Sequence, residues 1–311
     1  MYNAEISQMI SNIEISANRI RLRVLEHILK NNGGYMSQAC SSAEILAALY
    51  LYIMKLGPSI APLTPPKFKG VPGSNNQDYF RGGAYNGPLQ ADLDHFIFSP
   101  SHYALVLYAT LIEVGRLAED ALQDFNQDGS TVEMIGHEHS PGVDSTAGSL
   151  GQAISQAGGF ALARKLLNEV GREWVFMSDG EFQEGQIWEA INTMAYYRLD
   201  NIGVYVDVNG QQCDGLVQEV MSVEPLKAKL EAFGARVQVV DGHNVEELFN
   251  AGKYHKDGKP LFVLCYTNPT KFIPLLNNRK PKLHYLRFTS EEEKMEYQSL
   301  FEELEGMIPW K

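Results

Sequence analysis

The apolar positions at the start of the chain recur at the spacing of a helix. Between Ile6 and Leu29 they fall mostly three or four residues apart, and this stretch ends at Asn31-Asn32-Gly33-Gly34. Such spacing gives a helix one apolar face, and glycine commonly ends a helix. We therefore predict one long amphipathic helix here. Ser41-Ser42-Ala43-Glu44 is typical of a helix N-terminus, so a second helix is expected from there to Met54.

The stretch from Gly57 to Asp92 differs from its surroundings in composition and in hydrophobic pattern. It contains six prolines, six glycines and several asparagines, and its apolar residues follow no regular period. We predict a long irregular insertion, because proline and glycine interrupt both helices and strands. Loops of this length in compact domains usually either have a function or are disordered.

After this insertion, helical and strand-like patterns alternate along the chain. Short apolar runs predict buried strands at 174–177, 202–208, 237–240 and 261–266. Longer amphipathic stretches predict helices at 103–114, 149–167 and 187–197. This alternation favours an α/β fold in which a doubly wound, mostly parallel sheet carries helices on both faces. We expect one domain over residues 1–311, with the irregular insertion at about 57–92 and an acidic helix at about 290–307.

Composition disfavours several classes of protein. The formal net charge is -12, from 26 basic and 38 acidic residues without basic runs, so nucleic acid is not an expected partner. Cys40, Cys213 and Cys265 are odd in number and far apart, which fits neither a disulfide framework nor a metal-binding spacing. No signal peptide and no membrane-spanning run is visible, so we expect a cytoplasmic protein that does not bind membranes.

Two turn sequences follow two of the predicted strands. Ser178-Asp179-Gly180 follows the first, and Asp207-Val208-Asn209-Gly210 closes the second. Parallel strands bring their carboxyl ends to one edge of the sheet, where open sheets of this kind bind ligands. Oxygen atoms of Asp179 and Asn209 suit Mg2+ or Ca2+, while Gly180 and the N-H groups of the next helix suit an anionic ligand. Asp-Gly and Asn-Gly are also common turn sequences, so the pair alone does not establish a site.

The residues around this pair carry a family resemblance. Asp179 and Asn209 have the spacing of the thiamine-diphosphate fingerprint, and Ser178 to Ala190 resembles its transketolase version. Pro141 to Gln152 resembles the transketolase segment that packs against the cofactor's aminopyrimidine ring, and Phe98 to His102 resembles one that supplies an active-site histidine. The resemblance covers roughly residues 5–290, whereas a transketolase made as one chain continues through two further domains. It therefore implies the N-terminal, pyrophosphate-binding product of a split gene.

The resemblance also implies roles for individual residues. The metal ligands would be Asp179, Asn209 and the backbone carbonyl of Gln211. Contacts with the cofactor would come from His102, Gly148, Leu150, Asp179, Gly180, Glu181, Asn209 and His284. The catalytic residues would be His102, His137, His284 and Glu184. Glu184 and Glu189 match carboxylates at the family's subunit interface, where they are thought to link paired active sites.

The implied reaction explains this choice of residues. Thiamine diphosphate acts as a stabilised carbanion that takes a two-carbon ketol unit from a ketose and passes it to an aldose. Histidine suits the proton transfers on sugar hydroxyls because its ordinary pKa lies near neutrality. The glutamate that activates the cofactor belongs to the family's pyrimidine-binding domain, which has no counterpart here. The resemblance thus implies a C-terminal partner subunit in a heterotetramer, and a sugar phosphate or related anionic sugar as substrate.

Three features depart from the family pattern. Gly34-Tyr35 stands where the family has a Gly-His pair that touches substrate, so a phenol replaces an imidazole. The segment 136–141 is shorter than its counterpart; we favour His137 over His139 as the substrate-facing histidine, because His137 follows glycine as the family histidine does. The long insertion at 57–92 either caps the substrate channel or decorates the subunit interface. Either these changes are neutral, or the preferred ketose carries an unusual substituent such as a branch or a sulfonate.

Other interpretations remain open. The alpha subunit of a thiamine-dependent 2-oxo acid dehydrogenase carries a similar fingerprint, but His102, the 141–152 segment and His284 disfavour it. A non-catalytic, transketolase-like regulatory subunit would be expected to lose the metal ligands, yet Asp179 and Asn209 are both present. Deoxyxylulose phosphate synthase, a related enzyme made as one chain, is disfavoured by length.

Overall fold

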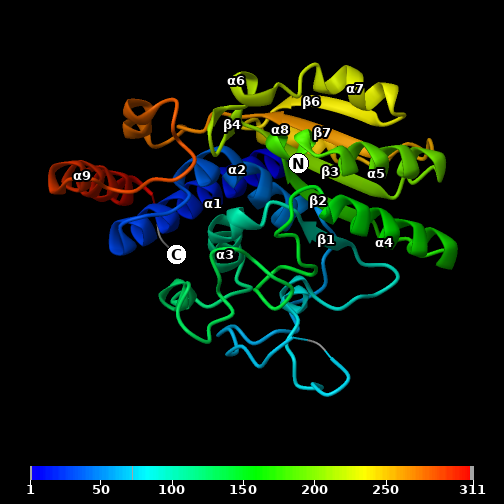
Figure 1. Ribbon diagram of the computed structural model, residues 1–311, viewed down its shortest axis with the longest axis horizontal. Coiled ribbons are helices and arrows are strands. Elements are labelled where there is room, and N and C mark those ends of the chain that lie inside the picture. Colours follow the sequence, from blue (N-terminus) through cyan, green and yellow to red (C-terminus); the bar gives the residue numbers. More distant parts are fainter. Residues whose placement is uncertain (1, 72, 309–311) are drawn as a thin grey trace.

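The centre of the fold is a sheet of five parallel strands (Figure 1). The computed structural model describes residues 2–71 and 73–308. Every neighbouring pair of strands is parallel. The strand order across the sheet is β1 (His95–Phe98), β2 (Glu173–Ser178), β3 (Ile202–Val208), β7 (Leu261–Tyr266) and β6 (Arg236–Asp241). The predicted α/β class with a mostly parallel sheet is therefore confirmed.

Side chains of the strands alternate between two cores, one on each face of the sheet. Trp174 and Phe176 of β2 belong to one core, and Val175 and Met177 belong to the other. The first core is completed by α1 (Tyr2–Asn31), α2 (Met36–Ala48), α3 (Ala104–Glu113) and α8 (Val245–Ala251). The second is completed by α4 (Ala153–Leu167), α5 (Gly185–Tyr196) and α7 (Leu226–Ala232). Because both faces are covered, the strands need the continuous apolar runs seen in the sequence.

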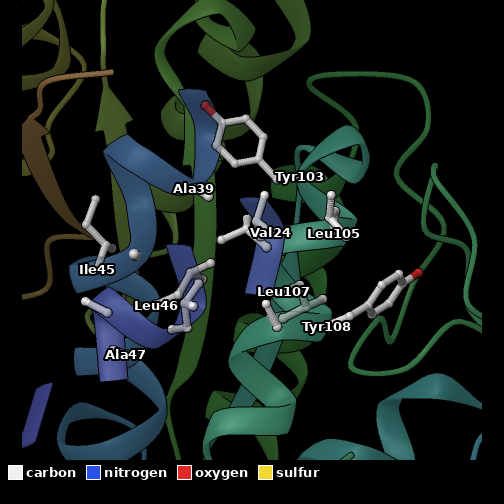
Figure 2. Packing of buried hydrophobic residues seen from close by; sticks show 14 of the residues in the cluster. Val24, Ala39, Ile45, Leu46, Ala47, Tyr103, Leu105, Leu107 and Tyr108 are labelled. Carbon is white, nitrogen blue, oxygen red and sulfur yellow. The ribbon is translucent and has the colours of Figure 1, made fainter. Parts of the chain in front are cut away.

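The larger core joins α1, α2 and α3 (Figure 2). Val24 of α1, Leu46 of α2 and Leu107 of α3 are completely buried there. Burial of each such side chain contributes roughly 2 kcal/mol through the removal of apolar surface from water. From this layer, the hydroxyls of Ser41 in α2 and of Tyr103, directly before α3, donate to Asp207 near the carboxyl end of β3.

The second helix begins earlier than the sequence indicated. α2 starts at Met36 rather than at Ser41, and it passes into a turn of π-helix at Leu49–Ile53. Ser41 and Ser42 lie inside the helix, where their hydroxyls donate to the carbonyl of Gln38 at 3.2 and 2.6 Å. The predicted start was wrong because serine hydroxyls can bond to the preceding turn of a helix as well as cap its first turn.

The sequence pattern also did not predict β1. This strand has four residues, pairs only with β2 at the edge of the sheet, and begins with a histidine. So short a run carries little periodicity, and only its pairing with β2 identifies it as a strand. Its place matters for function, since it leads directly into Ser99 and His102.

The segment 57–92 is irregular but well connected to the rest of the fold. Backbone hydrogen bonds join Phe68 to Gly129 at 2.9 Å and Gly82 to Glu138 at 2.7 Å. The segment extends on the side of the molecule away from α7 (Figure 1). It therefore packs along the loops that follow α3, and its last residues accept hydrogen bonds from Arg164 of α4.

The C-terminal helix α9 (Glu291–Met307) lies where the acidic amphipathic pattern placed a helix. It packs beside α1 (Figure 1), with Tyr297 and Phe301 buried. The hydroxyl of Ser290 accepts a hydrogen bond from the N-H of Glu293 at 3.2 Å and caps its first turn.

The remaining elements are short. They are α6 (Val217–Met221), the strands β4 (Gln211–Gln212) and β5 (Gly215–Leu216), and the 3-10 segments η2 (Gly82–Asn86), η3 (Ser101–Tyr103), η4 (Ala121–Asp124), η5 (Asp179–Gln183) and η6 (Pro274–Arg279). Across the described ranges, no helix combines the length and apolar character needed to cross a bilayer.

Candidate active site

The loops that follow β1, β2 and β3 meet at one edge of the sheet. His102 lies in η3 shortly after β1, Asp179 directly follows β2, and Asn209 directly follows β3. Ser178 at the end of β2 pairs with Asp207 in β3. The three predicted side chains are thus brought to the carboxyl edge, as parallel pairing requires.

A cavity of about 260 Å³ opens between these loops. Seven residues that the family resemblance implied line it: His102, Leu150, Gly180, Glu184, Asn209, Gln211 and His284. The other lining residues, which the sequence did not single out for this purpose, are Ser37, Gln38, Tyr103, Ser178, Gln183, Gln212 and Cys213. No lysine or arginine is among these described residues, so an anionic ligand would need another source of positive charge.

Three carboxylates lie buried at this edge of the sheet. Asp179, Glu181 and Asp207 are at most 2% exposed, and no ion pair joins them to a cationic side chain in the described part of the chain. Burial raises the pKa of each carboxyl group. For Asp179, burial together with the charge of Asp207 raises the pKa to about 7. Buried carboxylates without a counter-charge are costly, and either a bound proton or a cation from outside the chain would lower this cost.

The oxygen atoms of Asp179 are only partly satisfied. Its Oδ2 accepts a hydrogen bond from the N-H of Gly210 at 2.8 Å, whereas its Oδ1 is buried and has no protein partner. The side-chain Oδ1 of Asn209 accepts a hydrogen bond from the N-H of Gln211 at 2.9 Å, which leaves one lone pair free. A free carboxylate oxygen beside an amide oxygen is a suitable donor pair for Mg2+ or Ca2+.

A buried network fixes the orientation of Asn209. Its Nδ2 donates to Asp207 Oδ2 at 2.9 Å, to the hydroxyl of Tyr103 at 2.9 Å and to that of Ser41 at 3.3 Å. Because the nitrogen is held on the inner side, the amide oxygen faces outward, toward Gln211. Sequence reasoning missed Asp207; the signal was present, since a residue two positions before Asn209 shares its side of the strand.

Glu181 turns away from the cavity. Its Oε1 accepts from the N-H of Ser178 at 2.9 Å, and its Oε2 accepts from the N-H of Gly151 at 3.3 Å and from the hydroxyl of Ser99. It is absent from the described residues that line the cavity. Its carboxylate is therefore already occupied within the protein.

His102, His284 and Tyr35 form a compact group of rings. The centroids of the two imidazoles are 5.2 Å apart, and Tyr35 lies 5.7 Å from His102 and 5.4 Å from His284. Burial, with the neighbouring His284, lowers the pKa of His102 to about 3, and burial also lowers the pKa of His284. Both rings are consequently neutral near pH 7. The side chain of Gln38 donates to the carbonyl of His284 at 3.1 Å and anchors that segment to α2.

His137 and His139 lie in a neighbouring loop. Their rings stack at 5.7 Å, and the buried His139 packs at 4.5 Å against Phe68 of the 57–92 segment. The N-H of Gly136 donates to the carbonyl of Ser101 at 3.2 Å, which ties this loop to η3. His137 is more exposed and is not among the described residues lining the cavity, so its substrate-facing role stays a prediction.

Of the remaining predicted positions, Leu150, Gly180 and Glu184 line the cavity, whereas Gly148 and Glu189 do not. At Gly180 an added Cβ would meet protein atoms no closer than 3.9 Å, so packing does not demand glycine there. The lack of a side chain at this position leaves room on the cavity side. Gly148 and Leu150 are exposed in the loop that precedes α4. Glu184 and Glu189 are exposed at the start of α5, and Glu184 reaches the cavity wall.

Comparison with known proteins agrees with this geometry. A family model described as "Transketolase, thiamine diphosphate binding domain" matches residues 79–280. The chain belongs to the transketolase family. It is 34% identical to the "Putative uncharacterized transketolase family protein y4mO" of Sinorhizobium fredii, over 89% of this chain and 90% of that protein. It is 33% identical to the "6-deoxy-6-sulfo-D-fructose transketolase subunit SqwG" of a Clostridium species, over 84% of this chain and 86% of that one.

One-chain transketolases are much longer than this family member. Human transketolase is 30% identical over 80% of this chain, and the match covers 36% of the human protein. The solved structure of Leishmania mexicana transketolase shares the fold with a TM-score of 0.67 at 22% identity, over 95% of this chain and 45% of that one. The matched residues thus correspond to the thiamine-diphosphate-binding domain of a transketolase.

Proposed function

We propose that this chain is the pyrophosphate-binding subunit of a two-subunit transketolase that uses Mg2+, or Ca2+ in its place, to hold thiamine diphosphate. The observation that carries the proposal is the group of buried carboxylates Asp179, Glu181 and Asp207. They have no cation of their own among the described residues, and the free Oδ1 of Asp179 offers a ligand beside the cavity. A buried charge of this kind is stabilised when a metal supplies the missing positive charge.

The ligands that we propose for the metal are Asp179, Asn209 and the backbone carbonyl of Gln211. No group of three or more His, Cys, Asp or Glu residues in the described ranges could hold a metal ion by itself. The site therefore suits an ion that takes its remaining oxygen ligands from a diphosphate and from water, as Mg2+ commonly does.

The walls of the cavity suit the two ends of the cofactor. We assign Gly180 and His102 to the diphosphate and thiazolium end, and Gly148 and Leu150 to the aminopyrimidine end. When bound, thiamine diphosphate supplies the carbanion chemistry that breaks and re-forms a carbon-carbon bond of the sugar. Leu150, which is 39% exposed, would lose water contact against an aromatic ring, and this burial favours binding.

The histidines handle protons on the sugar hydroxyls in this proposal. Because the rings of His102 and His284 are neutral near pH 7, each carries one N-H donor and one acceptor nitrogen; in His284, Nδ1 lies 3.4 Å from the side-chain nitrogen of Gln38. Such a ring can take a proton from a hydroxyl and return it, whereas an imidazolium could only donate. We assign the same kind of task to His137, whose loop is hydrogen-bonded to η3.

A partner subunit would complete the active site. Two relatives matched over most of their length are named as subunits of larger enzymes. They are the SqwG protein and an apulose-4-phosphate transketolase subunit from Phocaeicola vulgatus, which is 26% identical over 85% of each chain. We propose a C-terminal partner that supplies the pyrimidine-binding domain and the activating glutamate, in a heterotetramer. The three cysteines form no disulfide, which fits the cytoplasmic location we propose.

Exposed apolar side chains support such an assembly. Leu166 and Leu167 at the end of α4 are 74% and 69% exposed, and Tyr196 at the end of α5 is 80% exposed. Glu184 and Glu189 are exposed on α5 as well. Apolar groups gathered on a surface commonly mark contacts with other chains, so we propose this side of the molecule as a subunit interface.

The ketose donor in this proposal carries an unusual substituent. Tyr35 contacts both site histidines, where a second imidazole would be expected from the family, and it changes both shape and hydrogen bonding at that point. Relatives named for 6-deoxy-6-sulfo-D-fructose and for apulose 4-phosphate support a donor of this kind. The 57–92 segment packs behind the His137 loop, and we propose that it shapes the same end of the site.

The test is to purify the chain and its partner separately and to assay ketol transfer. The chain alone should transfer nothing, and activity should appear on mixing with the partner, Mg2+ and thiamine diphosphate. Robust turnover without a partner would refute the two-subunit proposal. Oxidation of a 2-oxo acid with an artificial electron acceptor would instead favour the dehydrogenase alternative, and no turnover with any donor would favour a regulatory subunit.

A further inference from the structure

Glu181 lies at the junction of the loops that follow β1 and β2 and the loop that precedes α4. We propose that Glu181 is a positioning residue whose carboxylate sets the spacing between the loop for the cofactor's diphosphate and the loop for its aminopyrimidine. This inference rests on the proposed function of the site. It gives Glu181 a task other than the direct cofactor contact expected from its motif.

The contacts of Glu181 bridge three segments that are distant in sequence. Oε1 accepts from the N-H of Ser178 at 2.9 Å and from its hydroxyl at 3.2 Å. Oε2 accepts from the N-H of Gly151 at 3.3 Å and from the hydroxyl of Ser99. The side chain is completely buried. One carboxylate therefore joins the end of β2, the segment after β1 and the loop before α4. The backbone also joins the first two, since the N-H of Ser99 donates to the carbonyl of Phe176 at 3.0 Å, so the bond from Gly151 is the one that ties the loop before α4 to them through Glu181.

Each of these donors stands close in sequence to a proposed cofactor contact. The three donors and their neighbours are Ser99 before His102, Gly151 after Leu150, and Ser178 before Asp179. Gly151 has φ +83, and a Cβ there would lie 2.8 Å from the Cβ of Glu184, so no side chain could anchor this loop at that position. Its N-H bond to Glu181 is thus a polar anchor that a neighbouring side chain could not easily replace.

A carboxylate is well suited to this junction. Its two oxygens offer about four acceptor sites, and all the groups that face Glu181 act as donors. A glutamine of the same shape would turn an NH2 group toward one of the N-H or O-H donors and lose at least one bond. Burial raises the pKa of Glu181, and no ion pair in the described ranges offsets the cost of burying its charge. Its carboxylate is therefore stabilised by neutral hydrogen-bond donors alone.

The experiment compares two ligands that use different parts of the site. In the full chain assembled with its partner, calorimetry measures the Kd of thiamine diphosphate and of inorganic pyrophosphate, both with Mg2+. Pyrophosphate needs only the loop after β2, whereas the cofactor needs both loops at the correct spacing. For Glu181→Gln, we expect the Kd of the cofactor to rise about tenfold or more, and that of pyrophosphate to change less than about threefold.

Two further variants separate positioning from stability. Glu173 is an equally buried carboxylate at the opposite end of β2, so Glu173→Gln should lower the melting temperature without changing either Kd. If Glu181→Gln fails to fold, Ser99→Ala removes one of the bonds to Glu181 and should give a smaller rise in the cofactor Kd alone. All measurements are made well below the melting temperature of each protein.

The outcomes are distinct. Equal affinities of wild type and Glu181→Gln for the cofactor would overturn the positioning role, as would an equal loss for both ligands. If the wild-type assembly binds no thiamine diphosphate, the proposed function itself is wrong, and the positioning role falls with it.

Discussion

At the amino ends of β1 and β2, the buried side chains of His95, Asp144, Arg164 and Glu173 and the exposed Arg81 form a continuous series of ion pairs. Arg81 contacts Asp144 at 3.1 Å, His95 lies 2.6 Å from Asp144 and 2.7 Å from Glu173, and Arg164 contacts Glu173 at 3.2 Å. Burial alone would lower the pKa of His95, but its hydrogen bonds to both carboxylates outweigh burial and raise the pKa to about 9. Every charge in this series has a partner within the chain.

At the carboxyl ends of the same strands, the buried charges have the same sign. Asp179, Glu181 and Asp207 have raised pKa values, mainly because of burial, and they are held by neutral donors. A network in which every buried charge has an opposite charge beside it can stabilise a fold. Buried charges of one sign destabilise it until a ligand of the opposite charge binds. In the proposed function, the difference between the two edges separates the buried charges that serve structure from those that serve binding.

Removal of Asp179 should have the largest effect on binding. Asp179→Ala takes away a charged metal ligand, so with partner and Mg2+ present the Kd of thiamine diphosphate should rise about a thousandfold, or about 4 kcal/mol. The fold should survive, because an uncompensated buried carboxylate is removed. Calorimetry measures the affinity and thermal unfolding checks the fold, with Asp179→Asn as the variant that keeps shape but not charge. Wild-type affinity in Asp179→Ala would show that the metal site is misplaced.

Breaking the ion pairs at the amino ends of β1 and β2 should lower stability and leave cofactor affinity unchanged. Glu173→Gln removes one of the two carboxylates that pair with His95 and the buried carboxylate that pairs with Arg164, so the free energy of unfolding should fall by about 3 kcal/mol. Urea denaturation measures this change, and cofactor affinity of the folded protein should stay at the wild-type value. A loss of affinity without a loss of stability would contradict the division between the two edges.

The amino edge should also be sensitive to alkaline pH. A histidine whose folded pKa is raised from 6.5 to about 9 stabilises the fold fully below pH 6.5, and that contribution is lost as pH rises through 9. We expect the free energy of unfolding to fall by about 3 kcal/mol between pH 6.5 and 9 through this group. Denaturation of His95→Gln across the same range should lack this decrease; parallel curves for the two proteins would argue against a charged His95.

The smallest expected effect concerns donor choice at the carboxyl edge. Tyr35→His restores an imidazole beside His102 and His284 and should shift the kcat/KM ratio about tenfold toward xylulose 5-phosphate, relative to a sulfonated or branched ketose. A donor panel assayed with the partner measures the ratio, and Tyr35→Phe separates the hydroxyl from the ring. A wild-type preference for xylulose 5-phosphate or fructose 6-phosphate would show that Tyr35 does not select an unusual donor.

Much of the fold follows from local patterns. The predicted strands at 202–208 and 261–266 coincide with β3 and β7, because strands buried on both faces must be apolar throughout. The two elements that the sequence pattern predicted wrongly or not at all have a common cause. The start of α2 at Met36 and the strand β1 depend on contacts with distant segments, which no short window of sequence contains.

The sequence by itself determined which chemistry this chain carries. The spacing of Asp179 and Asn209 after two strands, with the motifs around them, indicated the metal and pyrophosphate site, because parallel strands must end at a common edge. Tertiary structure alone decided what each buried carboxylate does. Asp179 keeps one buried oxygen without a protein partner, Asp207 orients Asn209, and Glu181 accepts hydrogen bonds from three segments of the chain. These roles depend on which donors and which charges come within a few ångströms, and the approach of distant segments, not sequence spacing, sets that.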